Sequence, residues 1–308
     1  MAGTDTATTG RGTLTGQPER SGAGTGGRPD GQGRIARLAP TAILLLGAFY
    51  CLLPVAWVLV AASKDASTLF TSSTFAPGDA LVDNVAGLSA YRDGLFWRWM
   101  LNTLLYAGVG AALSAAVSGL SGYTLAKFAF PGRSVVFNVL LAGVLVPGIT
   151  LAVPQYLLLA KVGLTDTYWS VLLPSIVSPY GIYLARIYAA AAVPDSVVEA
   201  ARVDGASEFG IFRRVALPMM VPGLITVFLL QFVAIWNNFL LPFIMLADDE
   251  RFPVTLGLYT LLNQGNTQPA LYRFVIAGSL LSIVPLVALF LSLQRYWRID
   301  LLSGATKS

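Results

Sequence analysis

The residues with the clearest chemical role lie in a short polar stretch between two long apolar segments. Ser196 and Glu199 have the spacing of a capping box, in which each side chain bonds the other residue's backbone N–H at a helix start. Gly205 stands where a left-handed residue would end that helix, and residues 206–208 can begin a second one. The sequence therefore predicts a helix–turn–helix, here called the hairpin, within residues 191–218.

The first arm of the hairpin presents small side chains beside a carboxylate. Ala200, Ala201 and Gly205 would let the surface of another protein approach closely, and Glu199 could pair with an arginine of that protein. These features favour a docking surface for a soluble partner. The alternative is an amphipathic helix that lies on lipid.

The second arm of the hairpin carries aromatic residues at helical spacing. Phe209, Phe212 and Ala216 are three and four residues apart, so they share one face of a helix. We expect the two phenylalanines to form an aromatic pair beside the small residues of the first arm. Pro218 is expected to end this second helix just before the next apolar segment.

Uncharged polar side chains interrupt the apolar segment that follows. Gln231, Trp236, Asn237 and Asn238 could bind a sugar, because amides exchange hydrogen bonds with hydroxyls and flat rings cover apolar C–H faces. The alternative is that they bond neighbouring helices to one another and anchor one helix at the membrane interface.

The groups needed for most catalytic sites are missing. The chain has no histidine and a single cysteine, Cys51, which lies in an apolar run. No apolar segment has Asp, Glu, Lys or Arg in its central part, where such residues usually mark ion or proton pathways. We therefore predict no enzyme, no metal site and no cofactor bound by this chain, and no basic cluster indicates nucleic acid. This favours a neutral transported species. The alternative is a charged species whose charge is balanced by groups outside these segments.

Composition places the chain in a membrane. Of its 308 residues, 55% are hydrophobic and 12% charged, whereas soluble domains carry about 25% charged residues. A helix needs roughly 20 apolar residues to cross the hydrocarbon core. The predicted fold is all-α, a polytopic membrane protein with six transmembrane helices at about 38–63, 101–126, 135–160, 168–190, 219–247 and 274–294.

The rest of the chain is a polar N-terminal tail and a set of loops. Residues 1–33 have almost no large apolar side chains and are predicted to be a disordered cytoplasmic tail, with the transmembrane domain at 34–308. Lysines and arginines are more frequent on the side of both termini. The positive-inside rule therefore places both termini and the hairpin in the cytoplasm, and residues 248–250 outside.

Several motifs together resemble a known family. Glu199-Ala200-Ala201 with Asp204-Gly205-Ala206 and Leu217-Pro218 resembles the EAA loop of ABC importer permeases. The resemblance covers residues 38–308 and includes Asn102-Thr103-Leu104, Val162-Gly163-Leu164 with Asp166-Thr167, and Trp236-Asn237. Near the end, Ile283-Val284-Pro285 and Gln294-Arg295-Tyr296 resemble the MalG-type carbohydrate branch of the family.

The resemblance implies a MetI-like permease fold that pairs with a MalF-like second permease. The hairpin would dock a cytoplasmic ABC ATPase dimer: Glu199 pairs with it, Ala200 and Ala201 pack in its groove, and Gly205 makes the turn, with Asp204 and Phe209 on the same coupling surface. An extracellular solute-binding protein would deliver the sugar. ATP would be used by the ATPase, and this chain has no G-x-x-x-x-G-K-[ST] loop of its own.

One position departs from the family pattern. Asp300 stands where the family tail commonly has a glycine, although Gly304 and Lys307 match the residues after it. The resemblance implies that such tails reach toward the ATPase, and Asp300 puts that contact in doubt.

These observations lead to one main hypothesis and two rivals. The chain is predicted to be one transmembrane subunit of an ATP-driven sugar importer in the cell membrane. The first rival is an ABC permease for a non-sugar solute. The second is a self-contained secondary transporter, which would need internal repeats and a coupling-ion site that the sequence does not show.

Overall fold

The computed structural model describes residues 30–305, and every regular element in that range is a helix. This confirms the all-α prediction. Residues 1–29 of the predicted tail lie outside the described residues, and α1 (Asp30–Ala62) begins before the predicted tail ends at residue 33. The chain divides into two units, one up to Leu53 and one from Pro54 onward. The first unit contributes the start of α1, an apolar helix with exposed side chains, as expected of a surface that faces lipid.

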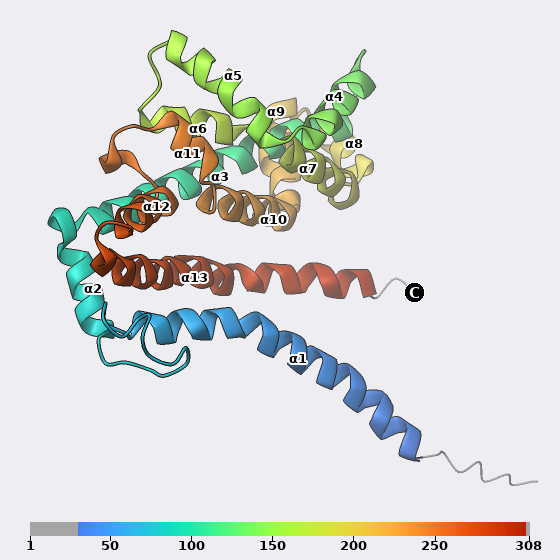
Figure 1. Ribbon diagram of the computed structural model, residues 1–308. Coiled ribbons are helices and arrows are strands. Elements are labelled where there is room, and N and C mark those ends of the chain that lie inside the picture. Colours follow the sequence, from blue (N-terminus) through green and yellow to red (C-terminus); the bar gives the residue numbers. More distant parts are fainter. Residues whose placement is uncertain (1–29, 306–308) are drawn as a thin grey trace, which may run out of the picture. The chain divides into compact units, whose positions relative to one another are not determined.

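The second unit is built around α3 (Leu95–Lys127), which follows α2 (Leu81–Ala90) and the turn η1 (Tyr91–Gly94). α3 packs against α6 and α7 on one side and α10 on another (Figure 1). Small residues make this packing close: a Cβ at Gly122 would lie 2.6 Å from the backbone nitrogen of Arg186 in α7. Without hydrophobic drive between helices in lipid, such close backbone approach is a main source of packing energy.

The predicted third apolar segment is a bent pair of helices. α4 (Arg133–Leu145) and α5 (Gly148–Lys161) meet at 105°. Pro147 lies at the bend; a proline disfavours helical geometry in the residue before it, and Val146 is extended with ψ 120°. Within the described residues, five helices are long and apolar enough to cross a membrane, or six if this bent pair is one span. Counted in that way, the helices match the six predicted segments.

The predicted fourth and fifth segments are also interrupted. The fourth consists of α6 (Tyr168–Ile176) and α7 (Pro179–Ala192), with Val177 and Ser178 between them. In the fifth, α10 (Leu217–Trp236) ends at Asn237 and a short helix, α11 (Leu240–Met245), follows. A single helix over 219–247 was therefore too long a prediction.

The remaining elements complete the two ends of the second unit. The hairpin contains α8 (Asp195–Val203), α9 (Glu208–Ile211) and the π-helical segment η2 (Phe212–Ala216). After α11 come η3 (Asp249–Arg251), α12 (Val254–Gly265), η4 (Pro269–Leu271) and α13 (Tyr272–Ala305). The sixth predicted segment lies within α13, as does Asp300, whose side chain is outside the described part.

Two clusters of buried side chains stabilise the second unit. The larger contains Trp99, Tyr106 and Trp236 and joins the first half of α3 to α10, α12 and α13. The smaller contains Tyr123 and Ile211 and joins the last turns of α3 to the hairpin. Both clusters therefore include α3.

Candidate functional site: an exposed hairpin and an uncharged cavity

The first arm of the hairpin begins differently from its prediction. Pro194 precedes the helix in an extended conformation (φ −65°, ψ 141°), and no side-chain capping bond is formed there. Ser196 lies inside the first turn of α8, so the predicted capping box with Glu199 was wrong. The proline, whose fixed φ suits an extended residue before a helix, sets the helix start two residues too early for the box.

The turn of the hairpin is the predicted one. Gly205 has a φ of +79°, and its N–H donates to Arg202 O at 3.0 Å, while Ala206 N–H donates to Ala201 O at 3.0 Å. This pair of bonds is the Schellman motif, which requires a left-handed residue at the position of Gly205. The glycine turn is therefore confirmed.

The second arm is held to the first by side chains. Ser207 accepts a hydrogen bond from Gly210 N–H at 3.2 Å and so starts α9, as predicted. The guanidinium of Arg202 donates twice to Glu208, at 2.7 and 3.2 Å, across the turn. A bidentate pair of this kind restricts geometry more than a single contact does. The angle between the two arms is thus held by contacts within the hairpin.

Pro218 does not end the second arm. The helix continues without a break from Glu208 through η2 into α10 and stops at Trp236. In η2 the N–H of Leu217 donates to Phe212 O, a wider π-type turn. The wider turn accommodates Pro218, which has no N–H to donate. The second arm of the hairpin is consequently the beginning of a membrane-spanning helix.

The predicted docking residues are largely exposed, but the predicted aromatic pair is split. Phe209 is 67% exposed, and Glu199, Ala200 and Asp204 are also exposed, whereas Ala201 is half-buried. Phe212 instead points inward and packs against Tyr123, with ring centroids 5.2 Å apart. The sequence spacing placed both rings on one face, but Phe212 packs on the ring of Tyr123 in α3 while Phe209 stays exposed.

An ion pair connects the end of α3 to the start of the hairpin. Lys127 Nζ lies 2.7 Å from Asp195 Oδ1, and the lysine side chain is only 7% exposed. The hydrogen bond and charge of Lys127 hold the pKa of the Asp195 carboxyl below its usual range. The hairpin is therefore fastened to α3 as well as to α10.

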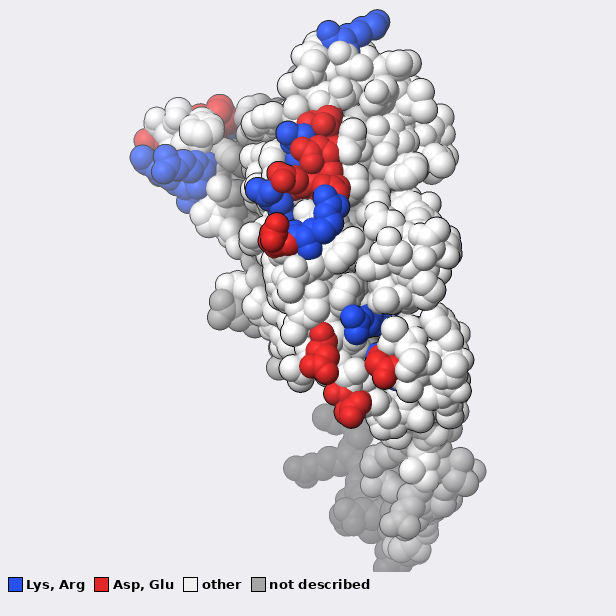
Figure 2. Space-filling view, turned by 60° about the vertical axis from the view of Figure 1, so that its left-hand side comes forward, with Lys and Arg blue, Asp and Glu red and all other residues white. Residues whose placement is uncertain are grey.

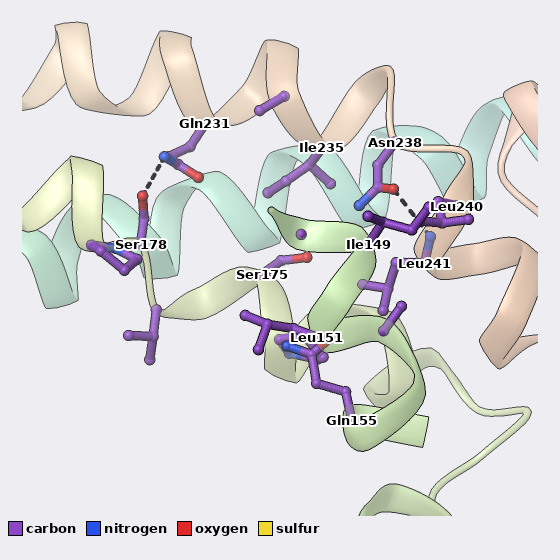
Figure 3. Close-up of a pocket in the computed structure, with 16 residues that line it drawn as sticks. Ile149, Leu151, Gln155, Ser175, Ser178, Gln231, Ile235, Asn238, Leu240 and Leu241 are labelled. Atoms are coloured by element: carbon purple, nitrogen blue, oxygen red, sulfur yellow. Dashed lines mark hydrogen bonds between the residues drawn. The ribbon is translucent and has the colours of Figure 1, made fainter. Parts of the chain in front are cut away.

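The second candidate site is a cavity of about 360 Å³ where three interrupted spans meet (Figure 3). Its polar side chains come from α5, α6, the α6–α7 break, α10 and the α10–α11 break: Gln155, Ser175, Ser178, Gln231 and Asn238. No charged side chain is among its lining residues. The volume is within the range of small-molecule sites, about 300–1,000 Å³.

Hydrogen bonds hold three of these polar groups in place. Gln231 Nε2 donates to Ser178 Oγ at 2.6 Å, and Ser178 Oγ also accepts from Gly181 N–H at 3.0 Å, which caps α7. Asn238 Oδ1 accepts from Leu241 N–H at 3.3 Å at the start of α11 (Figure 3). The same amides that face the cavity therefore stabilise the helix breaks that form it.

The other two predicted pathway residues lie elsewhere. Trp236 is 2% exposed and stacks on Phe232, and the Nδ2 of Asn237 donates to Val233 O at 2.8 Å. Both border a second cavity of about 450 Å³ between α10, α12 and α13. The four predicted residues are thus divided between two cavities.

Sequence reasoning missed the serines of the first cavity. Ser178 directly precedes Pro179, and a Ser-Pro pair inside an apolar segment is a signal of a helix start, with serine as N-cap and proline at the first helical position. That signal could have placed a break, and its exposed polar groups, at this point.

Comparison with known proteins identifies the family. Residues 97–298 match the family described as binding-protein-dependent transport system inner membrane component. The chain belongs to this family. It is therefore a multi-pass inner membrane permease component of ABC import systems, and the six-helix MetI-like fold expected from the resemblance is confirmed.

Relatives of this permease support the assignment along most of its length. The permease is 35% identical to the arabinooligosaccharides transport system permease protein AraQ of Halalkalibacterium halodurans. The match covers 84% of this chain and 92% of that protein. The permease is 31% identical to the lactose transport system permease protein LacG of Rhizobium radiobacter, over 85% of this chain and 93% of that protein. It is 30% identical to the sn-glycerol-3-phosphate transport system permease protein UgpE of Salmonella typhimurium, over 82% and 91%.

Solved structures show the same fold. One chain of a bacterial ABC transporter involved in the import of the acidic polysaccharide alginate superposes with a TM-score of 0.72 at 23% identity, over 85% of this permease and 96% of that chain. A second, a chain of the bacterial alginate ABC transporter in complex with its alginate pentasaccharide-bound periplasmic protein, gives a TM-score of 0.58 at 18% identity, over 86% and 94%.

Proposed function

We propose that this permease is one of two membrane subunits of an ATP-driven importer of a neutral sugar, and that its hairpin docks the ATPase. The observation that carries the proposal is the continuity of the hairpin with α10. The helix that starts at Glu208 beside exposed Phe209 also carries Gln231 into the first cavity. Movement imposed on the hairpin by a partner therefore reaches the cavity through one helix.

The coupling surface consists of the exposed face around the Gly205 turn. Glu199 makes no ion pair within residues 30–305, so its carboxylate is available for an arginine of the ATPase. Ala200, Asp204 and Phe209 are exposed on the same hairpin. We propose that ATP is bound and hydrolysed by this ATPase dimer and that the permease itself binds no cofactor and is no enzyme.

A neutral sugar is the substrate class that the first cavity fits best. Its polar groups are amides and hydroxyls, which both donate and accept hydrogen bonds as sugar hydroxyls do. Two relatives are named for arabinooligosaccharides and lactose. UgpE is named for sn-glycerol-3-phosphate, but a phosphate would need a cationic partner, and the lining contains none.

The remaining partners and the orientation belong to the same proposal. A MalF-like second permease would form the other half of the pathway, and an extracellular solute-binding protein would deliver the sugar. Both termini and the hairpin would face the cytoplasm, while the segment around Asp248–Glu250 would face outward. Lipid would cover the exposed apolar faces.

Affinity purification of this chain from its native membrane in mild detergent tests the proposal. A second six-helix permease and an ATPase should co-purify in stoichiometric amounts. Recovery of the chain alone or as a homodimer in repeated preparations would overturn the proposal and favour a self-contained transporter.

A further inference from the structure

Three motifs of the sequence have no role in the function proposed above. Asn102-Thr103 and Asp166-Thr167 lie at the end of α3 opposite the hairpin, as does the Asp248–Glu250 acidic run. The structure brings them together around residues 246–254, here called the 246–254 segment. This segment follows α11 and leads into α12, and Val254 at its end lines the second cavity.

Side chains of α3 bind the backbone of the 246–254 segment at residues 249–252 and 254. Asn102 Nδ2 donates to two carbonyls, Glu250 O at 2.8 Å and Phe252 O at 3.0 Å. Three further bonds complete the set: Trp99 Nε1 to Asp249 O at 2.8 Å, Tyr106 OH to Arg251 O at 3.0 Å, and Val254 N to Thr103 Oγ1 at 2.7 Å. The 246–254 segment should therefore move together with α3, because movement of one relative to the other would leave several buried polar groups without hydrogen-bond partners.

The loop before α6 holds the segment from its other side. Asp166 adopts a left-handed conformation (φ 54°), which is unfavourable for a residue with a side chain. In that conformation its carboxylate accepts from Ala247 N at 3.0 Å, from Asp248 N at 3.1 Å and from Arg251 at 3.1 Å. Tyr168 OH in turn donates to Asn102 Oδ1 at 3.1 Å, which connects this loop to the α3 contact.

Ion pairs strengthen the same end of α3 at its surface. Arg98 of α3 lies 2.7 Å from Glu250, and Arg92 pairs with Asp249. Figure 2 shows a central group of positive and negative side chains on one face, with further charged side chains below it, at the left edge and at the top, and uncharged surface between them.

The opposite end of α3 binds both arms of the hairpin. Lys127 pairs with Asp195 in the first arm, and Tyr123 packs on Phe212 in the second. Phe128, directly after α3, packs against Tyr123 and lies 6.0 Å from the guanidinium carbon of Arg202. The last turns of α3 thus contact the hairpin on both sides of its glycine turn.

The body of α3 is suited to transmit movement between these ends. Its 33 residues form one helix of about 50 Å at 1.5 Å per residue. It contains no proline, whereas α5, α6, α10 and α13 each contain one in their interior. Because proline is the usual cause of a sharp kink, α3 should bend less than these helices.

We propose that α3 is a strut that carries movement of the hairpin to the 246–254 segment, with Lys127 and Asn102 as the positioning residues at its two ends. The inference rests on the proposed function, in which the ATPase acts on the hairpin. It adds a second route by which movement of the hairpin is transmitted. The first route runs through α10 to the first cavity, and the second runs through α3 to the 246–254 segment.

The test follows the segment by cysteine labelling in the transporter that co-purifies with this chain, held in nanodiscs. Cys51→Ser removes the single cysteine, and Ala247→Cys places an exposed one in the segment. The rate of reaction with a water-soluble maleimide is compared without nucleotide and after trapping with ATP, Mg²⁺ and orthovanadate. Trapping should change the rate, and Asn102→Leu should abolish that change while ATP hydrolysis remains.

Asn84→Leu is the matched control. Asn84 is also buried, and its Nδ2 donates to two backbone carbonyls, Ala62 O at 2.9 Å and Lys64 O at 2.8 Å, but it lies on α2. This variant should keep the trapping-dependent change. If Asn102→Leu does not assemble, Lys127→Ala tests the other end of the strut and should also lose the change, with Lys127→Arg restoring it.

The outcomes separate the strut from the function on which it rests. A change in labelling that persists in both Asn102→Leu and Lys127→Ala overturns the strut alone. The strut is also overturned if the labelling rate of the parent does not change on trapping although the ATPase is present and trapped. The absence of any co-purifying ATPase overturns the proposed function itself.

Discussion

The hairpin and the first cavity are built in opposite ways. The contacts within the hairpin join residues close in sequence, such as Arg202 with Glu208, and its outer face is charged and exposed. The cavity joins residues far apart, such as Ser178 with Gln231, and it has no charged lining. A docking element must keep its shape in water, whereas a pathway in the membrane depends on where separate helices break. Mutations in the two regions should therefore have different effects on ATP-driven uptake.

The largest effect is expected at the turn of the hairpin. Gly205→Val places a β-branched residue at φ +79°, a left-handed conformation that costs about 1–2 kcal/mol even for an ordinary residue. ATP-driven uptake should be lost while the protein still inserts in the membrane. Uptake of labelled substrate, normalised to membrane protein, measures this.

Gly132 provides a matched control for that strain. It has a φ of +83° and, like Gly205, no heavy atom within 4 Å of an added Cβ, but it lies between α3 and α4. Gly132→Val should therefore carry similar strain and keep most of the uptake. Equal losses in the two variants would mean that strain alone, and not the docking role of the hairpin, explains the result.

A smaller but more specific effect is expected at Glu199. The side chain is exposed, so Glu199→Ala should change the free energy of unfolding by less than about 0.5 kcal/mol. It should nevertheless uncouple ATP hydrolysis from uptake, because the proposed ion pair to the ATPase is lost. The ratio of substrate transported to ATP hydrolysed is the measurement, and an unchanged ratio would contradict the docking role.

In the cavities, Gln231→Ala should reduce uptake more than Asn237→Ala does. Gln231 lines the first cavity and bonds Ser178, whereas Asn237 borders the second cavity and bonds its own helix at Val233 O. Both variants should still co-purify with the ATPase. Uptake at several substrate concentrations would reveal the order, and no change in Asn237→Ala would assign that residue a purely structural role.

The smallest effect concerns pH and the ion pair at the base of the hairpin. Because the pKa of Asp195 is lowered in the folded protein, the pair contributes stability above the unfolded carboxyl pKa of about 3.9 and loses it as pH falls further. The thermal midpoints of the parent and of Lys127→Ala should differ slightly at neutral pH and converge below about pH 4. A difference that stays constant across that range would exclude the carboxylate as its source.

The comparison of hairpin and cavity also explains which predictions were right. The turn at Gly205 and the start of a second helix at residues 206–208 depend on backbone geometry within a few residues, and both are confirmed. The capping box at Ser196 was wrong because Pro194 starts the helix earlier. The helix end at Pro218 was wrong because a π-helical turn, packed through Phe212 on Tyr123 of α3, accommodates the proline.

The sequence by itself determined the membrane class, the apolar spans, the hairpin with its glycine turn and the family, because apolar length, local backbone preference and motif order are properties of contiguous residues. Only the tertiary structure decided which residues share a cavity. It separated Gln231 and Asn238 from Trp236 and Asn237, brought Ser178 to Gln231, and joined Asn102 to the 246–254 segment. These contacts depend on where the helices break and how they pack against α3. Within an apolar span, the hydrophobic pattern of the sequence does not show which polar group bonds to which.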